Sequence, residues 1–246
     1  MIRDQLEGRE EEIIWILSLL PKSFVLVGGY AVSALSSHRL SVDCDIVTST
    51  NDLKEVVGAL TGAGYAKGRS ARIGKGYRGA VEIYVGKARG GNVSVDIFVD
   101  SMTARGTGAS WGYEYIRKNS AEVIVSGVGG SATIRAPTRE LLLAVKIHSG
   151  RDADMRDIVM LSDGADWRAV ARHVARGDRE TLLKQLADIV ERMGSEQFDS
   201  SLRAAFALRR NIKPLVSSCR KRLAALKSEL SADSSLYWCL HNFLTS

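Results

Sequence analysis

Two aspartates separated by one residue, Asp43 and Asp45, are the first side chains in this sequence whose types and spacing suggest chemistry. They lie in the segment V-D-C-D-I-V, whose apolar residues predict a buried strand. Because a strand repeats every two residues, both carboxylates point to one face and Cys44 points to the other. Two adjacent carboxylates repel each other, at a cost of about 1 kcal/mol or more, unless a cation lies between them. The alternative is a pair of aspartates at a solvent-exposed strand end.

A third carboxylate, Asp96, lies in the segment V-S-V-D-I-F-V-D, which alternates as a strand would. Its position between Val95 and Ile97 is poorly explained by folding, and a third metal ligand beside the first two explains it. Glu82, in V-E-I-Y-V, competes for this role, and we favour Asp96. Carboxylate oxygens are the ligands that Mg²⁺ or Mn²⁺ prefers. The sequence contains no paired cysteines and no HxxxH pattern, so a zinc-type site is not expected.

A glycine pair, Gly28-Gly29, follows the apolar segment S-F-V-L-V and precedes a helical pattern. Glycines at such a junction let the backbone approach a phosphate closely. The helix that follows offers unpaired N–H groups and the positive end of its dipole. The pair therefore suggests a phosphate site, although strand–glycine–helix turns also occur for steric reasons alone.

The elements that must position these residues follow an α/β pattern up to residue 136. Apolar periodicity predicts helices over residues 4–20 and 51–64, the second capped by Asn51 or Asp52. Short apolar or alternating runs predict strands over 23–27, 42–47, 71–76, 80–86, 93–100, 122–126 and 132–135. After Pro137 glycine becomes sparse and helical periodicity continues to the end. We therefore predict an α+β protein with a mixed β-sheet flanked by helices in residues 1–136, followed by an all-helical domain in residues 137–246.

The composition is that of a soluble globular protein, with 45% hydrophobic and 25% charged residues in a chain of 246. No apolar stretch approaches the roughly 20 residues that cross a bilayer. The charged start lacks the apolar core of a secretion signal. Three widely separated cysteines, Cys44, Cys219 and Cys239, predict no disulfide framework. We expect a cytoplasmic protein with no membrane contact.

The formal charge of +6 points to a polyanionic partner, and its distribution is more informative than its size. Between Arg203 and Lys227 there are eight basic residues and no acidic one. A solvated helix face explains such a run as well as phosphate binding does. The run therefore marks a candidate nucleic-acid surface without establishing one.

The spacing of the glycines and aspartates resembles a known signature. A hydrophobic–Gly-Gly pair, thirteen residues and then Asp-hydrophobic-Asp-hydrophobic, here LVGG-YAVSALSSHRLSV-DCDI, resembles the DNA polymerase β-like nucleotidyltransferase superfamily. The stretch RELLLAVKIHSGRDADMRDIVML is similar to the Lys-x4-Arg and Asp-x2-Asp helices of the AbiEii and MenT type of nucleotidyltransferase. Gly-Gly-Tyr-Ala-Val also looks like the Gly-Gly-Trp-Ala opening of antibiotic nucleotidyltransferases. The first two of these matches, the glycine–aspartate signature and the Lys-x4-Arg and Asp-x2-Asp helices, together span most of residues 24–163.

This resemblance implies a nucleotidyltransferase fold and a metal-dependent transfer from a nucleoside triphosphate (NTP), with pyrophosphate leaving. Asp43 and Asp45 would bind both metal ions, and Asp96 would bind the catalytic one. The residues implied in nucleotide binding are Gly28, Gly29, Tyr30, Arg39, Lys146, Arg151 and Asp157. For the later residues a structural explanation stays open, because Lys146 can extend from a helix surface and Arg151, Asp154 and Asp157 can form a salt-bridge cluster.

The leading expectation for the acceptor is an RNA end, a tRNA in particular, as in the MenT-like relatives. RNA binding is then assigned to Arg209, Arg210, Arg220, Lys221 and Arg222. An antitoxin partner belongs to the same expectation. The alternatives are an aminoglycoside-type small molecule, a protein hydroxyl, or an inactive nucleotide- or RNA-binding module. The basic charge argues against a polycationic aminoglycoside, whereas the choice of NTP and the oligomeric state stay open.

Overall fold

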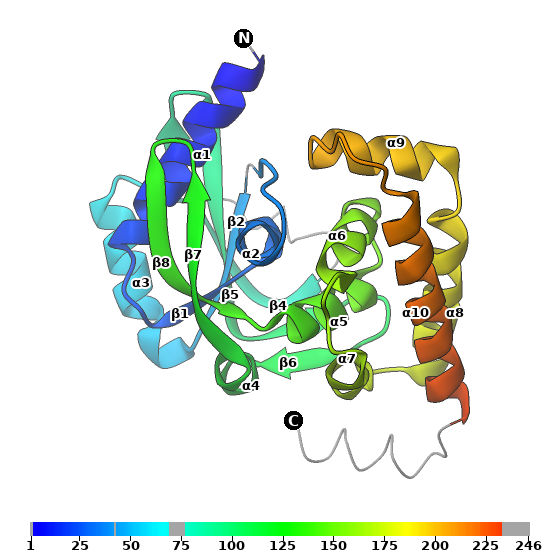
Figure 1. Cartoon of the computed structure of the whole chain (residues 1–246). Helices are drawn as coiled ribbons and strands as arrows, with labels where there is room; N and C mark the ends of the chain where they lie inside the picture. The colour runs from blue at the N-terminus through cyan, green and yellow to red at the C-terminus, as the bar shows by residue number, and fades with distance from the viewer. Residues whose placement is uncertain (1, 42, 69–76, 233–246) are drawn as a thin grey trace. The chain divides into compact units, whose positions relative to one another are not determined.

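A computed structural model of the chain describes residues 2–41, 43–68 and 77–232. The chain forms two compact units, one of residues 1–102 and 112–138, the other of residues 103–111 and 139–246 (Figure 1). The predicted domains were contiguous, whereas the segment Thr103–Trp111 groups with the helices of the second unit. The strand predicted over residues 71–76 lies outside the described residues, as does Cys239.

The first unit contains a mixed sheet whose strands are β1 (Phe24–Val27), β2 (Asp43–Thr48), β3 (Ala66–Lys67), β4 (Tyr77–Ala88) and β5 (Gly91–Ala104). They run in the order β1-β2-β5-β4-β3. β1 pairs antiparallel with β2, and β2 pairs parallel with β5. β6 (Ser110–Gly112) pairs with β5, and β7 (Ser120–Gly127) forms a separate antiparallel hairpin with β8 (Gly130–Pro137).

Four helices accompany these strands: α1 (Ile2–Leu19), α2 (Gly28–Leu35), α3 (Thr50–Gly62) and α4 (Tyr113–Lys118). α1 buries Ile13, Ile16 and Leu17, which recur at helical spacing. The α3 helix begins earlier than predicted, because its N-cap is Ser49, whose side chain accepts a hydrogen bond from the Asp52 N–H. The prediction of a cap at residue 51 or 52 is therefore wrong.

Asp100 connects the sheet to the start of α3. The strand was predicted to end near residue 100, yet β5 continues to Ala104. Asp100 adopts a φ of 61°, which aspartate tolerates better than most side chains, and its carboxylate accepts hydrogen bonds from Thr50 N at 2.7 Å and Thr50 Oγ1 at 2.5 Å. These bonds lower the pKa of Asp100. Asp100 therefore has a local structural role on β5, distinct from that expected of Asp96.

The second unit is built from helices that were expected from residue 137 onward. Asp166, Asp178 and Ser195 cap three of them by accepting backbone hydrogen bonds with their side chains. The helices are α5 (Arg139–Ser149), α6 (Asp152–Ser162), α7 (Trp167–Val174), α8 (Arg179–Arg192), α9 (Glu196–Ala205) and α10 (Lys213–Ala232). A mixed sheet with helices, followed by a run of helices, confirms the predicted α+β class. No helix among the described residues is long and apolar enough to span a membrane.

His148 explains why residues 103–111 belong to the helical unit. Its Nδ1 lies 2.7 Å from Thr107 Oγ1 and its Nε2 lies 2.8 Å from the Val174 carbonyl oxygen. Its ring meets the Trp111 indole edge to face, with centroids 5.3 Å apart. Burial lowers the pKa of His148 to about 4, so the ring is neutral at physiological pH. The histidine thus bonds the segment before β6 to α5 and to the end of α7.

Candidate active site

The register of β2 against β5 brings two of the predicted carboxylates side by side. Asp45 is the Cα partner of Asp96, and Asp43 is the partner of Ser94. In-register residues of neighbouring parallel strands point to the same face of a sheet. Asp43, Asp45 and Asp96 therefore share one face, as the sequence predicted for the first two. Asp43 is exposed, whereas Asp45 and Asp96 are half-buried.

Cys44 lies on the opposite face of β2, and the charge of these carboxylates affects the pKa of its thiol. Burial raises the pKa of its thiol well above the ordinary value, and the negative charges of Asp45, Asp96 and Asp43 raise it further. The thiol therefore stays protonated. On the aspartate side, Ser94 Oγ donates a hydrogen bond to Asp43 Oδ1 at 2.9 Å. The three carboxylates thus concentrate negative charge at one point of the sheet.

Oxygen ligands on one strand face fit Mg²⁺ or Mn²⁺ in their chemistry. Their side chains, as they stand, do not form a closed ligand set, since no group of three or more His, Cys, Asp or Glu residues within residues 2–41, 43–68 and 77–232 is placed to hold a metal ion. The competing candidate Glu82 is engaged elsewhere. It binds Lys67 Nζ of β3 at 2.9 Å and accepts the Tyr84 hydroxyl at 3.0 Å. Strand pairing thus places Asp96, and not Glu82, beside Asp45.

Gly28 makes room for the Asp45 carboxylate. Its φ of 67° lies in the left-handed region, and a Cβ at this position would lie 1.9 Å from Asp45 Oδ2. Val27, the N-cap of α2, makes no side-chain capping bond. The amino end of α2, with the positive end of its dipole, therefore lies beside a carboxylate of the candidate site. Glycine is required here for both its φ and its lack of a side chain.

Gly29 brings a cation to the same helix end. A Cβ on Gly29 would lie 2.8 Å from Ser41 Oγ and 3.0 Å from Arg39 Nη2. The Arg39 guanidinium therefore packs onto the first turn of α2. A helix amino end together with an arginine is a combination that favours phosphate oxygens. The structure thus places Arg39 against Gly29, while the neighbouring Gly28 lies against the Asp45 carboxylate.

The segment that follows α2, residues 36–41, is held by side chains of α2 itself. Tyr30 donates its hydroxyl hydrogen bond to the Ser41 carbonyl at 2.8 Å. Ser33 Oγ accepts from Arg39 N at 3.2 Å and donates to the Arg39 carbonyl at 3.1 Å. Burial, followed by nearby negative charges, raises the pKa of Tyr30. Tyr30 therefore contributes its side chain to the loop and its backbone N–H to the helix end.

Glu10 is a functional candidate that the sequence reasoning missed. It lies on the buried face of α1 with 1% exposure. Its Oε1 lies 2.7 Å from His38 Nε2, and its Oε2 accepts from Val128 N at 2.9 Å. This carboxylate therefore attaches both the Arg39 loop and the β7–β8 turn to α1. The signal in the sequence was a glutamate among Ile13, Ile14 and Leu17 on the apolar side of the helix.

In the second unit, Asp154 is the centre of a buried ion-pair network. Its carboxylate binds Lys146 Nζ at 2.6 Å, Arg151 Nε at 2.6 Å and Ser149 Oγ at 2.6 Å. Lys146 also binds Asp157 at 2.9 Å. Lys146 is 3% exposed, so its side chain does not extend from the helix into solvent. The salt-bridge explanation that the sequence left open for Arg151, Asp154 and Asp157 thus describes these contacts.

The electrostatics of the network favour the ionised form of Asp154. Burial alone would raise its pKa, but the charge of Lys146 and the hydrogen bond and charge of Arg151 outweigh burial and lower it. The family resemblance implied a nucleotide role for Asp157 and not for Asp154, yet Asp154 makes more of the contacts. The nucleotide-binding role of Lys146, Arg151 and Asp157 stays a prediction, and Arg151 is the member with an appreciably exposed side chain, at 38%.

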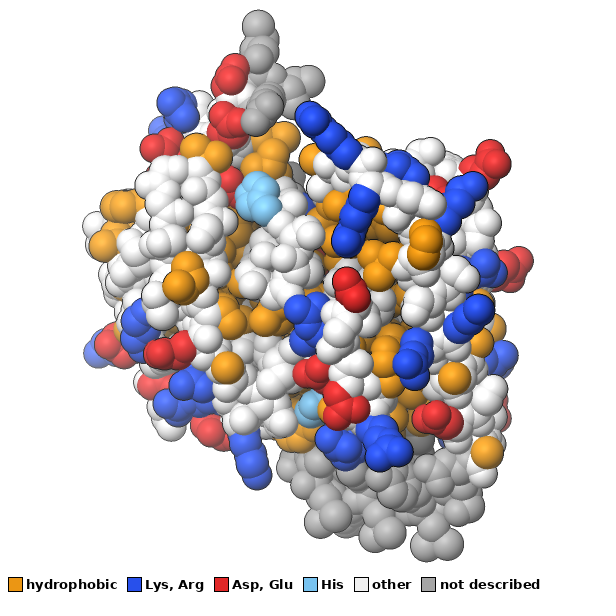
Figure 2. All heavy atoms as spheres, viewed as in Figure 1, with side chains coloured by type: hydrophobic (Ala, Val, Ile, Leu, Met, Phe, Trp, Pro, Cys, Tyr) orange, Lys and Arg blue, Asp and Glu red, His pale blue; other side chains and the backbone are white. Residues whose placement is uncertain are grey.

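The basic residues assigned to RNA divide into two groups. Arg209 and Arg210, between α9 and α10, and Lys221 and Arg222, on α10, are exposed. Arg220 is half-buried, and its Nε donates to the Val190 carbonyl at 2.9 Å, at the end of α8. Figure 2 shows Lys and Arg side chains distributed over the visible face of the molecule. Four of the five predicted residues are therefore available to a ligand, and Arg220 supports the helix packing.

The chain is similar to solved structures only at low sequence identity. No protein-family model matches the chain, and no curated protein matches it. Among solved structures it is similar to the JHP933 protein of Helicobacter pylori, with 13% identity over 97% of this chain and 98% of that one, at a TM-score of 0.44. A second H. pylori protein, described provisionally as a nucleotidyltransferase, is 13% identical, with 93% and 96% covered and a TM-score of 0.41. The antibiotic-resistance factor ANT(2'')-Ia is 14% identical, with 94% and 96% covered and a TM-score of 0.33.

The Gly28→Ala variant tests the contact between α2 and the carboxylates. We expect it to lose at least about 1 kcal/mol of unfolding free energy, because alanine is strained at this φ and its Cβ meets Asp45. Gly58→Ala, in α3, meets nothing within 4 Å and is expected to be neutral or stabilising. Urea unfolding measures both. Equal stability of the two variants would contradict this packing.

The Asp154→Asn variant tests the buried network. We expect a loss of about 3 kcal/mol in unfolding free energy, because Lys146 and Arg151 lose the charge that they share. Asp152→Asn on the same helix, whose side chain is 82% exposed, is the matched control and should cost far less. Because the folded-state pKa of Asp154 is lowered, its stabilisation is present above its unfolded pKa and is lost as the pH falls below about 4. Loss of that acid dependence in Asp154→Asn is the second readout.

Proposed function

We propose that this chain is a metal-dependent nucleotidyltransferase, which moves a nucleoside monophosphate from an NTP to an acceptor hydroxyl and releases pyrophosphate. The observation that carries the proposal is the register of β2 against β5, which puts Asp45 beside Asp96 with Asp43 on the same face. Carboxylates concentrated on one face of a sheet destabilise the fold by mutual repulsion unless they bind a cation, and such clusters are typical of functional sites. The helix amino end at Gly28 and Gly29, with Arg39 beside it, would bind the phosphate groups of the NTP in such a site.

In this proposal Asp43, Asp45 and Asp96 hold Mg²⁺ or Mn²⁺. Bound divalent ions would supply charge neutralisation of the triphosphate and polarise the phosphorus that is attacked. The chain itself would bind the triphosphate through the backbone N–H groups that begin α2, at Gly28, Gly29 and Tyr30.

Two further side chains act in this proposal on the triphosphate and on the acceptor. Arg39, which packs onto the same helix turn, would add a fixed positive charge beside the triphosphate. Asp96 would accept the proton of the attacking hydroxyl.

The Lys146 network would contribute through its exposed member. Arg151 has 38% of its side chain exposed, whereas Lys146 and Asp157 are buried. We therefore propose Arg151 as the contact to the nucleotide. Lys146, which also binds Asp157, would hold the carboxylate of Asp154. Asp154 in turn orients the Arg151 guanidinium through the bonds of 2.6 and 3.2 Å.

For the acceptor we propose an RNA end, a tRNA in particular. The support is the exposed basic group Arg209, Arg210, Lys221 and Arg222, in a stretch without acidic residues. Such side chains bind phosphates by releasing the counterions around a nucleic acid. A polycationic small molecule would be repelled by the same charges. A protein hydroxyl and a small molecule are the other outcomes of the acceptor test.

Transfer is tested by incubating the protein with each α-labelled NTP, Mg²⁺ and total tRNA, followed by gel analysis. We expect label in RNA, and a loss of at least about 100-fold in Asp45→Asn and Asp96→Asn, the scale of removing one charge-stabilising group from a site. Asp100→Asn, on the same strand as Asp96 but bonded to Thr50, is the control and should keep activity. Label in protein would overturn the RNA acceptor, and equal activity in Asp45→Asn would overturn the site.

RNA binding is tested with a variant in which Arg209, Arg210, Lys221 and Arg222 are all alanine. We expect weaker tRNA binding and a salt slope reduced by about 0.9 for each phosphate that the variant no longer neutralises. The control removes the same charge from exposed residues of the first unit, namely Lys54, Lys87, Arg117 and Lys118. Filter binding between about 50 and about 200 mM salt gives both quantities. Identical slopes in the two variants would contradict the assignment.

A further inference from the structure

A groove beside α1 shares no residue with the candidate active site and has its own chemistry. Its volume is about 440 Å³, within the range of small ligand sites. All of its walls belong to the first unit. The lining comes from α1, from Arg89 in the turn between β4 and β5, and from Gly129 of the β7–β8 turn together with the first two residues of β8.

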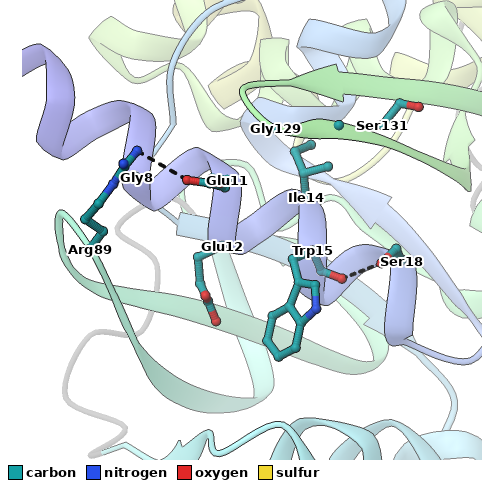
Figure 3. Close-up of a pocket in the computed structure, with 10 residues that line it drawn as sticks. Gly8, Glu11, Glu12, Ile14, Trp15, Ser18, Arg89, Gly129 and Ser131 are labelled. Carbon is teal, nitrogen blue, oxygen red and sulfur yellow. Dashed lines mark hydrogen bonds and ion pairs between the residues drawn. The ribbon is translucent and has the colours of Figure 1, made fainter.

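The α1 side of the groove is an exposed stripe at helical spacing. Glu11, Glu12 and Trp15 recur at three and four residues and therefore lie on one side of the helix. Figure 3 shows Glu12 and Trp15 projecting from the same side of α1. Trp15 is 45% exposed and Leu19, one turn further, is 50% exposed. The fold thus leaves an indole ring uncovered beside two carboxylates, with an exposed leucine one turn further along α1.

The walls of the groove are fixed by close backbone contacts. A Cβ on Gly90 would lie 1.6 Å from the Gln5 carbonyl oxygen, so the β4–β5 turn packs directly on α1. Arg9 Nε also donates to the Gly90 carbonyl at 2.9 Å. On the other side, a Cβ on Gly129 would lie 2.9 Å from Glu11 Cγ. The groove is therefore preformed, which lowers the cost of binding.

The charge of the groove is opposite to that of the chain. Two acidic residues and one basic residue line it, which gives −2 + 1 = −1, whereas the chain carries +6. The Tyr65 hydroxyl holds Glu12 Oε1 at 3.1 Å. Glu11 binds Arg89 Nη2 at 3.3 Å, with side chains 51% and 71% exposed, so this ion pair is weak and replaceable.

We infer that this groove binds an arginine side chain of a partner protein, presented beside an apolar residue. An indole face attracts a guanidinium by a cation–π interaction, and neighbouring carboxylates accept its hydrogen bonds. Leu19 extends the apolar surface for the adjoining residue. Arg89, which already bonds Glu11, shows that this carboxylate accepts a guanidinium. The volume of about 440 Å³ admits an arginine side chain and part of the adjoining residue.

Calorimetric titration with short peptides tests this inference on the intact chain. The probe is a capped peptide with one arginine next to one leucine, and its control carries neutral, isosteric citrulline in place of arginine. We expect saturable binding of the arginine peptide and at least about tenfold weaker binding of the citrulline peptide. Absence of saturable binding, or equal affinity for both peptides, would overturn the inference.

Variants assign the binding to the groove. Trp15→Ala and Glu12→Gln should each weaken binding at least about fivefold, whereas Ile124→Ala, at another exposed apolar residue with 63% exposure, should leave it unchanged. Arg89→Ala should strengthen binding, because it removes the competing guanidinium, and misfolding cannot produce that gain. Sedimentation provides the last check. A dimer that dissociates in Trp15→Ala would assign the groove to a second copy of the chain and overturn the arginine partner.

Discussion

Parallel pairing of β2 with β5 brings the carboxylate of Asp45 beside Asp96 and leaves Asp43 two residues further along the same face. This arrangement does not stabilise the folded chain, because each negative charge repels the others in a sheet whose remaining side chains are largely apolar. The surrounding structure is organised around that repulsion. Gly28 has no side chain, so Asp45 fits against the amino end of α2. Arg39, from the segment after α2, places its positive charge against the next residue of the helix, Gly29.

The second unit contains a fully buried carboxylate whose charge is paired within the protein. Asp154 is surrounded by Lys146, Arg151 and Ser149, and its negative charge is compensated within the protein. Such a network is self-sufficient, because its charges are paired and hydrogen-bonded without a ligand. In the first unit, by contrast, strand register places like charges next to each other. Strand register is the reason for proposing chemistry at Asp45 and Asp96, and the paired contacts of Asp154 are the reason for proposing a supporting role for it.

The position of Arg39 depends on residues that are distant in the chain. Its loop is bonded to α2 through Ser33 and Tyr30, and to α1 through the contact of His38 with Glu10. The same Glu10 carboxylate accepts the backbone N–H of Val128 in the β7–β8 turn. One buried acid therefore connects three parts of the first unit.

Local patterns in the sequence determined a large part of this description. The two-residue period of a strand put Asp43 and Asp45 on one face, and the glycine pair marked the junction of β1 and α2, because both effects depend only on neighbouring residues. Other features required the tertiary structure. The choice of Asp96 over Glu82 depends on which strands pair, and the burial of Lys146 depends on how α5 meets α6. Glu10 and Arg220 bind backbone groups far away in the chain, which no local period can indicate. The sequence therefore determined which side chains face together along one element, and pairing between elements decided which charges meet.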